Sequence, residues 1–131
     1  TIGGTTTSVR LTLGDTGNLT LATGYLLRVS SNTGTATGTT RTDALQLSGD
    51  FKRLSTVASG TGVILPTGVI GMSIVIVNSG ANAVKIYANG SETIDGVAGS
   101  TGVTLPNPGR CLYWFSAANT WHSMMFNGTS A

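Results

Sequence analysis

The residues best suited to chemistry in this 131-residue chain are one histidine and one cysteine, eleven positions apart. His122 would have to act as the base of any Ser-His-Asp arrangement, yet no G-x-S-x-G segment presents a nucleophile. A zinc site needs several His, Cys or carboxylate ligands at coordinating spacing, which this pair does not supply. We therefore expect Cys111 to be a small buried apolar residue and His122 to lie at a surface or an interface.

The five carboxylates do not suggest a catalytic pair either. A glycosidase needs two of them facing each other across a cleft, whereas Asp15, Asp43 and Asp50 stand beside Gly or Thr, as is ordinary for Asp in turns or strand starts. Glu92 and Asp95 are three residues apart near a turn, a spacing that could support weak calcium binding, but no D-x-D-x-D-G loop accompanies them. We expect no enzymatic activity, no metal and no cofactor.

The composition favours strands and turns. Gly, Thr and Ser make up 54 of the 131 residues, and only 12 residues are charged. The net charge is +2 and the basic residues are scattered, which argues against nucleic acid as a partner. The longest apolar run is a handful of residues, so we expect no membrane span. Residues 1–131 are expected to form a single β domain.

Apolar and polar residues alternate with a period of two through much of the first half, and no long helical period is present. Val9–Leu13 and Asn18–Leu21 flank a Gly-rich turn and predict a hairpin. Tyr25–Val29 and Ala44–Leu47 predict further strands. The polar segment Ser30–Thr40 between them fits a loop or a polar edge strand, and we favour the loop.

The second half predicts its strands more clearly. Met72–Val77 contains a continuous apolar run, which indicates a central strand covered on both faces. Val84–Tyr87 returns after a small-residue turn, and Arg110–Phe115 and Trp121–Phe126 close the chain. The expected fold is all-β: a single β-sandwich or jelly-roll-like domain of about ten short antiparallel strands.

A short repeat supports this expectation. Thr61–Pro66 recurs forty residues later as Thr101–Pro106, and each copy ends in Leu-Pro, which cannot continue a strand ladder. A Gly-containing bend, a strand, a small-residue turn and a second strand follow each copy. We interpret the two units, each a short strand followed by a hairpin, as equivalent halves of one sandwich.

Aromatic residues are concentrated near the C-terminus, where alternation must turn about half of the rings into the core. Outward rings would more often meet another subunit than a sugar. Residues 1–8 carry little that could form a core, and we expect an extended arm laid on a neighbouring subunit. The candidate interface residues are Ile2, Arg10, Tyr87, Trp121 and His122.

One part of the chain resembles a known family. The order Leu65-Pro66, Asn78-Ser79-Gly80-Ala81-Asn82, Ile86-Tyr87 and Ile94-Asp95-Gly96 is similar to a module of virion structural proteins of tailed bacteriophages, among them capsid decoration proteins and fibre or tail-associated proteins. The closing Ala118-Asn119-Thr120-Trp121 resembles the module's Gly-Thr-Trp ending, with the Gly replaced. The resemblance extends over roughly residues 60–126.

This resemblance implies a non-enzymatic protein of the virion, assembled in the host bacterial cytoplasm and commonly a homotrimer. Such a module has no catalytic residues to carry over. The first expectation is a capsid decoration (cement) protein that binds the major capsid protein or other virion subunits and stabilises the assembled head. The alternative is a head- or tail-fibre adhesin domain that binds a host surface glycan or protein. A carbohydrate-binding module and an enzyme are further alternatives.

Overall fold

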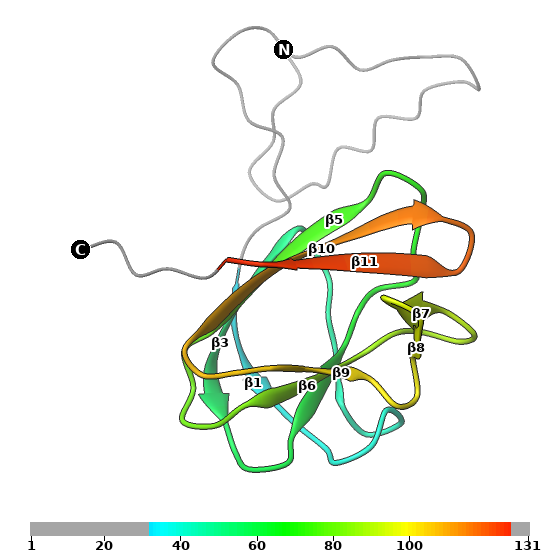
Figure 1. The fold of residues 1–131 in the computed structure, drawn as a ribbon. Helices are drawn as coiled ribbons and strands as arrows, with labels where there is room; N and C mark the ends of the chain where they lie inside the picture. The colour runs from blue at the N-terminus through cyan, green and yellow to red at the C-terminus, as the bar shows by residue number, and fades with distance from the viewer. Residues whose placement is uncertain (1–31, 127–131) are drawn as a thin grey trace, which may run out of the picture.

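The computed structural model describes residues 32–126, which form eleven β-strands and no helix (Figure 1). The prediction of an all-β chain is confirmed for this range. Accordingly, these residues contain no helix that could span a membrane. The strands are β1 (Asn32–Ala36), β2 (Leu45–Gln46), β3 (Phe51–Val57), β4 (Gly62–Ile64), β5 (Ser73–Asn78), β6 (Val84–Tyr87), β7 (Thr93–Ile94), β8 (Val97–Ala98), β9 (Val103–Leu105), β10 (Gly109–Ala117) and β11 (Thr120–Met125).

From β1 to β6 the chain winds between two sheets. β1, β3 and β5 are neighbours in a seven-stranded sheet, β2, β4 and β6 are neighbours in a four-stranded sheet, and all of these pairs are parallel. Each turn of the winding therefore adds one strand to each sheet, as in a β-solenoid. The step between paired residues is 18 for Leu45 and Val63 and 24 for Phe51 and Val75.

Antiparallel strands close the winding at its C-terminal side (Figure 1). β9 pairs with β6 at the end of the four-stranded sheet, and β10 pairs with β5 in the seven-stranded sheet. β11 returns beside β10 as a true hairpin, and the short strands β7 and β8 complete that sheet. The strand orders are β1-β3-β5-β10-β11-β7-β8 and β2-β4-β6-β9.

The prediction of antiparallel pairing in a jelly-roll-like sandwich is wrong, because five of the nine strand pairs formed by residues 32–126 are parallel. The turn after β5 does not make a hairpin; it carries the chain into the other sheet. Buried Asn78 fixes that turn, since its Nδ2 donates to Asn82 O (2.9 Å) and Pro106 O (3.1 Å). Gly80 must be small there, because a Cβ would come within 2.6 Å of Val57.

The sequence repeat does not produce equivalent halves. Its first copy contains β4 and its second contains β9, and the two strands flank β6 in the four-stranded sheet. β4 runs parallel to β6 whereas β9 runs antiparallel to it. The same short pattern of alternating residues therefore serves in both kinds of ladder, because the pattern fixes which side chains point inward and not the strand direction.

The expectation of a loop at Ser30–Thr40 is also wrong, since β1 occupies residues 32–36. Its pairing with β3 depends on the small residue at position 34. Lys52 of β3 points to the inner side of the sheet and is only 7% exposed. A Cβ on Gly34 would come within 2.6 Å of Lys52 Cε, so glycine leaves the space that this side chain fills.

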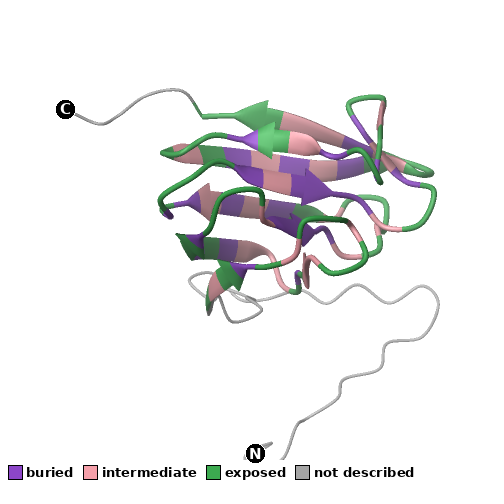
Figure 2. Cartoon of the chain, turned by 90° about the horizontal axis from the view of Figure 1, so that it is seen from below, coloured by how far each residue is buried: buried purple, intermediate pink, exposed green. Residues whose placement is uncertain are grey.

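Both sheets contribute to one core. Ile74 and Ile76 of β5 meet Val84 and Ile86 of β6 in the same buried cluster, and buried residues alternate with half-buried ones along most of these two strands (Figure 2). β5 is central, as predicted, because it lies between β3 and β10. Its other face is only half-buried, however, so the prediction that both faces are covered does not hold among the described residues.

We predict that Ile76→Ala lowers the free energy of unfolding by about 2–5 kcal/mol, because Ile76 is fully buried between two paired strands. Thr56→Ala, at an exposed position of β3, is the matched control and should change it by less than about 0.5 kcal/mol. Urea unfolding followed by tryptophan fluorescence measures both. A loss below about 1 kcal/mol for Ile76→Ala would contradict the shared core.

Candidate interface and polar hollow

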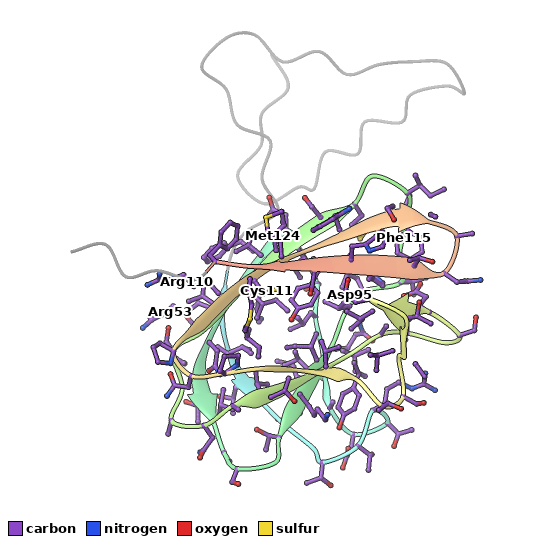
Figure 3. The ribbon with its side chains drawn as sticks, in the orientation of Figure 1. Arg53, Asp95, Arg110, Cys111, Phe115 and Met124 are labelled. Carbon is purple, nitrogen blue, oxygen red and sulfur yellow. The ribbon has the colours of Figure 1, made fainter. Side chains whose placement is uncertain are left out.

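The outer face of the seven-stranded sheet carries a row of apolar side chains, one from each of four adjacent strands. Phe51 of β3 lies opposite Val75 of β5, Val75 opposite Leu112 of β10, and Leu112 opposite Met124 of β11. We call these four residues the outer apolar row. Figure 3 shows Met124 and Cys111 on opposite sides of the sheet, with Met124 turned away from the core. Met124 is 53% exposed.

The neighbouring rows extend this face. On one side Val77 lies between Arg53 and Arg110, and Arg53 Nε donates to Ser79 Oγ (3.4 Å). On the other side Trp114 lies opposite His122, with ring centroids 5.6 Å apart. A contiguous apolar face of this kind is typical of a surface that meets another molecule.

His122, Asp95 and Ser123 bring together the three residue types of a hydrolytic triad, but their hydrogen bonds are arranged differently. Ser123 donates to the Asp95 carboxylate through its hydroxyl (2.5 Å) and its backbone N–H (3.0 Å). His122 Nδ1 lies 3.6 Å from Asp95 Oδ1. In a triad the serine hydroxyl bonds to the histidine, and the aspartate orients the other ring nitrogen. Here Asp95 instead fastens the turn after β7 to β11.

Two of the five candidate interface residues are not at the surface of the chain. Trp121 and Tyr87 were expected to face outward, but they are 0% and 4% exposed. The Trp121 indole packs edge-to-face on Phe115 at 5.1 Å between ring centroids, and Tyr87 OH donates to Thr39 O at 3.2 Å. The Trp121 indole N–H and the Tyr87 hydroxyl each donate to an acceptor inside the protein, Glu92 Oε2 and Thr39 O, which allows both rings to enter the core. The outward orientation of both rings is therefore corrected.

Of the remaining three, His122 is half-exposed and lies on the outer face beside Trp114. Ile2 and Arg10 lie outside the described residues, as does the expected arm at residues 1–8. The outer apolar row was missed because the sequence predicts that the strand containing Val75 is covered on both faces, and because the residues aligned with Val75 lie on other strands. The continuous apolar run Cys111–Phe115, which must place apolar side chains on both faces of a strand, is the sequence signal that could have identified it.

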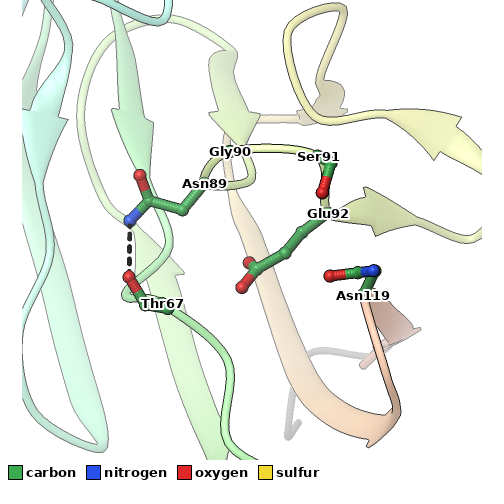
Figure 4. Close-up of a pocket in the computed structure, with 6 residues that line it drawn as sticks. All are labelled: Thr67, Asn89, Gly90, Ser91, Glu92 and Asn119. Carbon is green, nitrogen blue, oxygen red and sulfur yellow. Dashed lines mark hydrogen bonds between the residues drawn. The ribbon is translucent and has the colours of Figure 1, made fainter.

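The second candidate site is a shallow polar hollow of about 370 Å³ at the turn between β6 and β7. Thr67, Asn89, Gly90, Ser91, Glu92 and Asn119 line it (Figure 4). Asn89 Nδ2 bonds to Thr67 Oγ1 (3.4 Å) and to Leu65 O (3.2 Å), so its amide holds the wall of the hollow. Ser91 and Asn119 supply a hydroxyl and an amide, the groups that hydrogen-bond sugar hydroxyls.

The Glu92 carboxylate is already engaged within the protein. Its Oε1 accepts from the Gly68 backbone N–H at 2.7 Å, and its Oε2 accepts from Trp121 Nε1 at 2.8 Å. Glu92 is 6% exposed, and a buried carboxylate with both oxygens bonded is a structural clamp. The sequence interpretation of Glu92 as a turn residue missed this role, because no local sequence pattern predicts a hydrogen bond to Trp121, which lies 29 positions away.

Cys111 is 1% exposed, which confirms the prediction that it is a small buried residue. Burial raises the pKa of its thiol, and hydrogen bonding with Tyr113 and Ser123 offsets part of that effect. Burial likewise raises the pKa of the Tyr113 phenol. Both groups are therefore neutral at physiological pH and act as core residues.

Residues 32–126 bring together no group of three or more His, Cys, Asp or Glu side chains that could hold a metal ion. No protein-family model, curated protein or solved structure matches the chain. The outer apolar row and the polar hollow are the two candidate functional features of the described residues.

The Glu92–Trp121 bond can be tested by a double-mutant cycle. We predict that Glu92→Gln lowers the free energy of unfolding by about 1–3 kcal/mol, because a neutral amide has one acceptor oxygen for two buried N–H donors. In the Trp121→Phe background the same change should cost less, since one donor has gone. Additive losses in urea unfolding would contradict the clamp.

We predict that Cys111 resists thiol reagents while the protein is folded, because the reactive thiolate is scarce and the sulfur is covered. Labelling with a disulfide reagent near pH 8, followed by absorbance, should give no rapid reaction without denaturant and one thiol per chain in 6 M guanidinium. Rapid stoichiometric labelling of the native protein would show that the sulfur is accessible.

Proposed function

We propose that the protein is a non-enzymatic virion subunit, a capsid decoration (cement) protein that docks through the outer apolar row. The single observation that carries this proposal is the alignment of Phe51, Val75, Leu112 and Met124 across four adjacent strands. A strand face is flat and presents its side chains at fixed spacing, so such a row forms the apolar centre of an interface without rearrangement.

The absence of charge from the outer apolar row supports the same proposal. Its four residues are Phe, Val, Leu and Met, and Arg53 and Arg110 lie in the neighbouring row, so docking through the outer apolar row itself desolvates no ion. The resemblance of roughly residues 60–126 to a module of phage virion proteins supports a phage head as the location. The proposed partner is the major capsid protein or another virion subunit, and the proposed assembly is a homotrimer formed in the host bacterial cytoplasm before incorporation in the virion.

The alternative is a head- or tail-fibre adhesin domain, and the polar hollow favours it. The amides of Asn89 and Asn119 and the hydroxyls of Thr67 and Ser91 fit a neutral ligand rich in hydroxyl groups. Binding to a glycan array that is lost in Asn119→Ala and kept in Met124→Glu would favour the adhesin over the decoration protein.

The docking proposal predicts that Met124→Glu weakens binding to empty heads of the encoding phage by about tenfold or more, because it buries an unpaired charge. Met125→Glu is the matched control: the neighbouring methionine is 40% exposed but opposes Cys111 on the other side of the sheet. Co-sedimentation measures binding, and circular dichroism verifies that both variants fold.

Wild-type binding should also change little when the salt concentration rises from about 0.05 M to about 0.5 M, because the contact is apolar. Equal losses in the two methionine variants, or a strong weakening by salt, would overturn docking through the outer apolar row. Mass measurement in solution tests the homotrimer separately.

A further inference from the structure

Among residues 32–126, Asn89 is the one asparagine that precedes a glycine, and it lies in the turn between β6 and β7. The backbone nitrogen of such a glycine can attack the asparagine side chain, because no Cβ hinders the approach. The Gly90 nitrogen loses its proton as it bonds to Asn89 Cγ, the Cγ–Nδ2 bond breaks, and the departing nitrogen takes up a proton and leaves as ammonia. Water then opens the cyclic imide to aspartate or isoaspartate.

The closed turn holds the amide that has to leave. Asn89 Nδ2 lies 3.2 Å from Leu65 O, 3.3 Å from Gln46 Oε1 and 3.4 Å from Thr67 Oγ1, the last of which Figure 4 shows. The backbone is held as well, since Asn89 O accepts from the Glu92 N–H at 2.9 Å. The side chain can turn toward the next backbone nitrogen only when its own hydrogen bonds break, so the reaction requires the turn to open.

The acid that the reaction produces does not fit the same place. A carboxylate has no N–H to donate, and the carbonyl oxygen of Leu65 can only accept. Gln46 cannot turn its amide to supply a donor without loss, because its Nε2 already donates to Ile64 O (3.3 Å) and Leu65 O (3.0 Å). A carboxylate at position 89 therefore faces acceptor oxygens, which opposes closure of the turn.

We propose that Asn89 is a deamidation site gated by local opening of the turn between β6 and β7. While the turn is closed the amide is protected, and the free energy of opening the turn sets the rate of the reaction. The product adds a negative charge to the wall of the polar hollow and leaves the turn less firmly closed. The proposal concerns the isolated chain and does not depend on docking through the outer apolar row.

The first experiment incubates the full chain at mildly alkaline pH, folded and in concentrated guanidinium, and follows deamidation by mass spectrometry of tryptic peptides. Cleavage after Lys85 and Arg110 separates Asn89 from the other Asn-Gly pair, Asn127-Gly128, which lies outside the described residues. We expect Asn89 to react about tenfold or more slowly in the folded protein than in guanidinium. In guanidinium, Gly90→Ala should slow the reaction, because a Cβ then hinders the attacking nitrogen.

Two variants with the same chemical change test the gate. Thr67→Val removes one acceptor of the Asn89 amide and should speed deamidation of the folded protein about threefold. Thr61→Val removes a hydroxyl that donates to Ala58 O (2.8 Å) in the turn before β4, and it should leave the rate unchanged. Circular dichroism verifies that both variants fold, and their rates in guanidinium should be equal.

A second pair of variants tests the consequence. Asn89→Asp should lower the midpoint of urea unfolding, whereas Asn119→Asp, the same change in another residue that lines the hollow, should not. Equal rates for Asn89 in the folded and unfolded wild type overturn the proposal, as does equal acceleration by the two threonine variants. Equal unfolding midpoints for the two aspartate variants overturn the claim that the product opposes closure of the turn.

Discussion

The parallel register between successive turns is the constraint on which the rest of the described structure depends. Because β1, β3 and β5 pair in one direction, and β2, β4 and β6 do the same, each turn places its inward residues directly beside those of the next. A continuous core follows from that alignment, and it includes Leu54 and Ile76 from one sheet and Val63 and Ile86 from the other. A shift of the strand pairing by one residue would move the core-facing side chains of each strand to the opposite face of the sheet.

The same register creates the outer face. Alternation that directs Ile74 and Ile76 into the core must direct Val75 and Val77 outward, and the pairing partners of Val75 fall in line with it. The outer apolar row is therefore a consequence of apolar residues on both faces of a central strand. Folding alone does not require an apolar outer face, and contiguous apolar faces are rare on monomeric proteins.

The far end of the seven-stranded sheet is held differently, by side chains rather than long ladders. β7 and β8 have two residues each, so backbone pairing there is slight. Glu92 and Asp95 compensate, one by joining Gly68 to Trp121 and the other by joining Ser123 to the turn after β7. The two carboxylates whose spacing could have supported weak calcium binding therefore fasten the shortest strands.

The sequence predicts the all-β class, the central place of β5 and the burial of Cys111, because each depends on composition or on a local apolar pattern. It does not predict the parallel winding, since period-two alternation is the same in parallel and antiparallel strands. Nor does it show that Trp121 points inward, because its indole needs the distant Glu92 as acceptor. The sequence does not predict β1, because its pairing depends on the contact between Gly34 and the side chain of Lys52, which belongs to another strand.

The antiparallel closure by β9 and β10 gives the molecule a polarity. Beside β6 and β5 these reversed strands end the parallel winding, and β10 continues into the hairpin that carries Leu112 and Met124. On the side of β1 and β2 the step length already varies from turn to turn, and the connections absorb the difference. The lengths of these connections can therefore differ among designed versions of the chain while the strands that carry the outer apolar row keep their register.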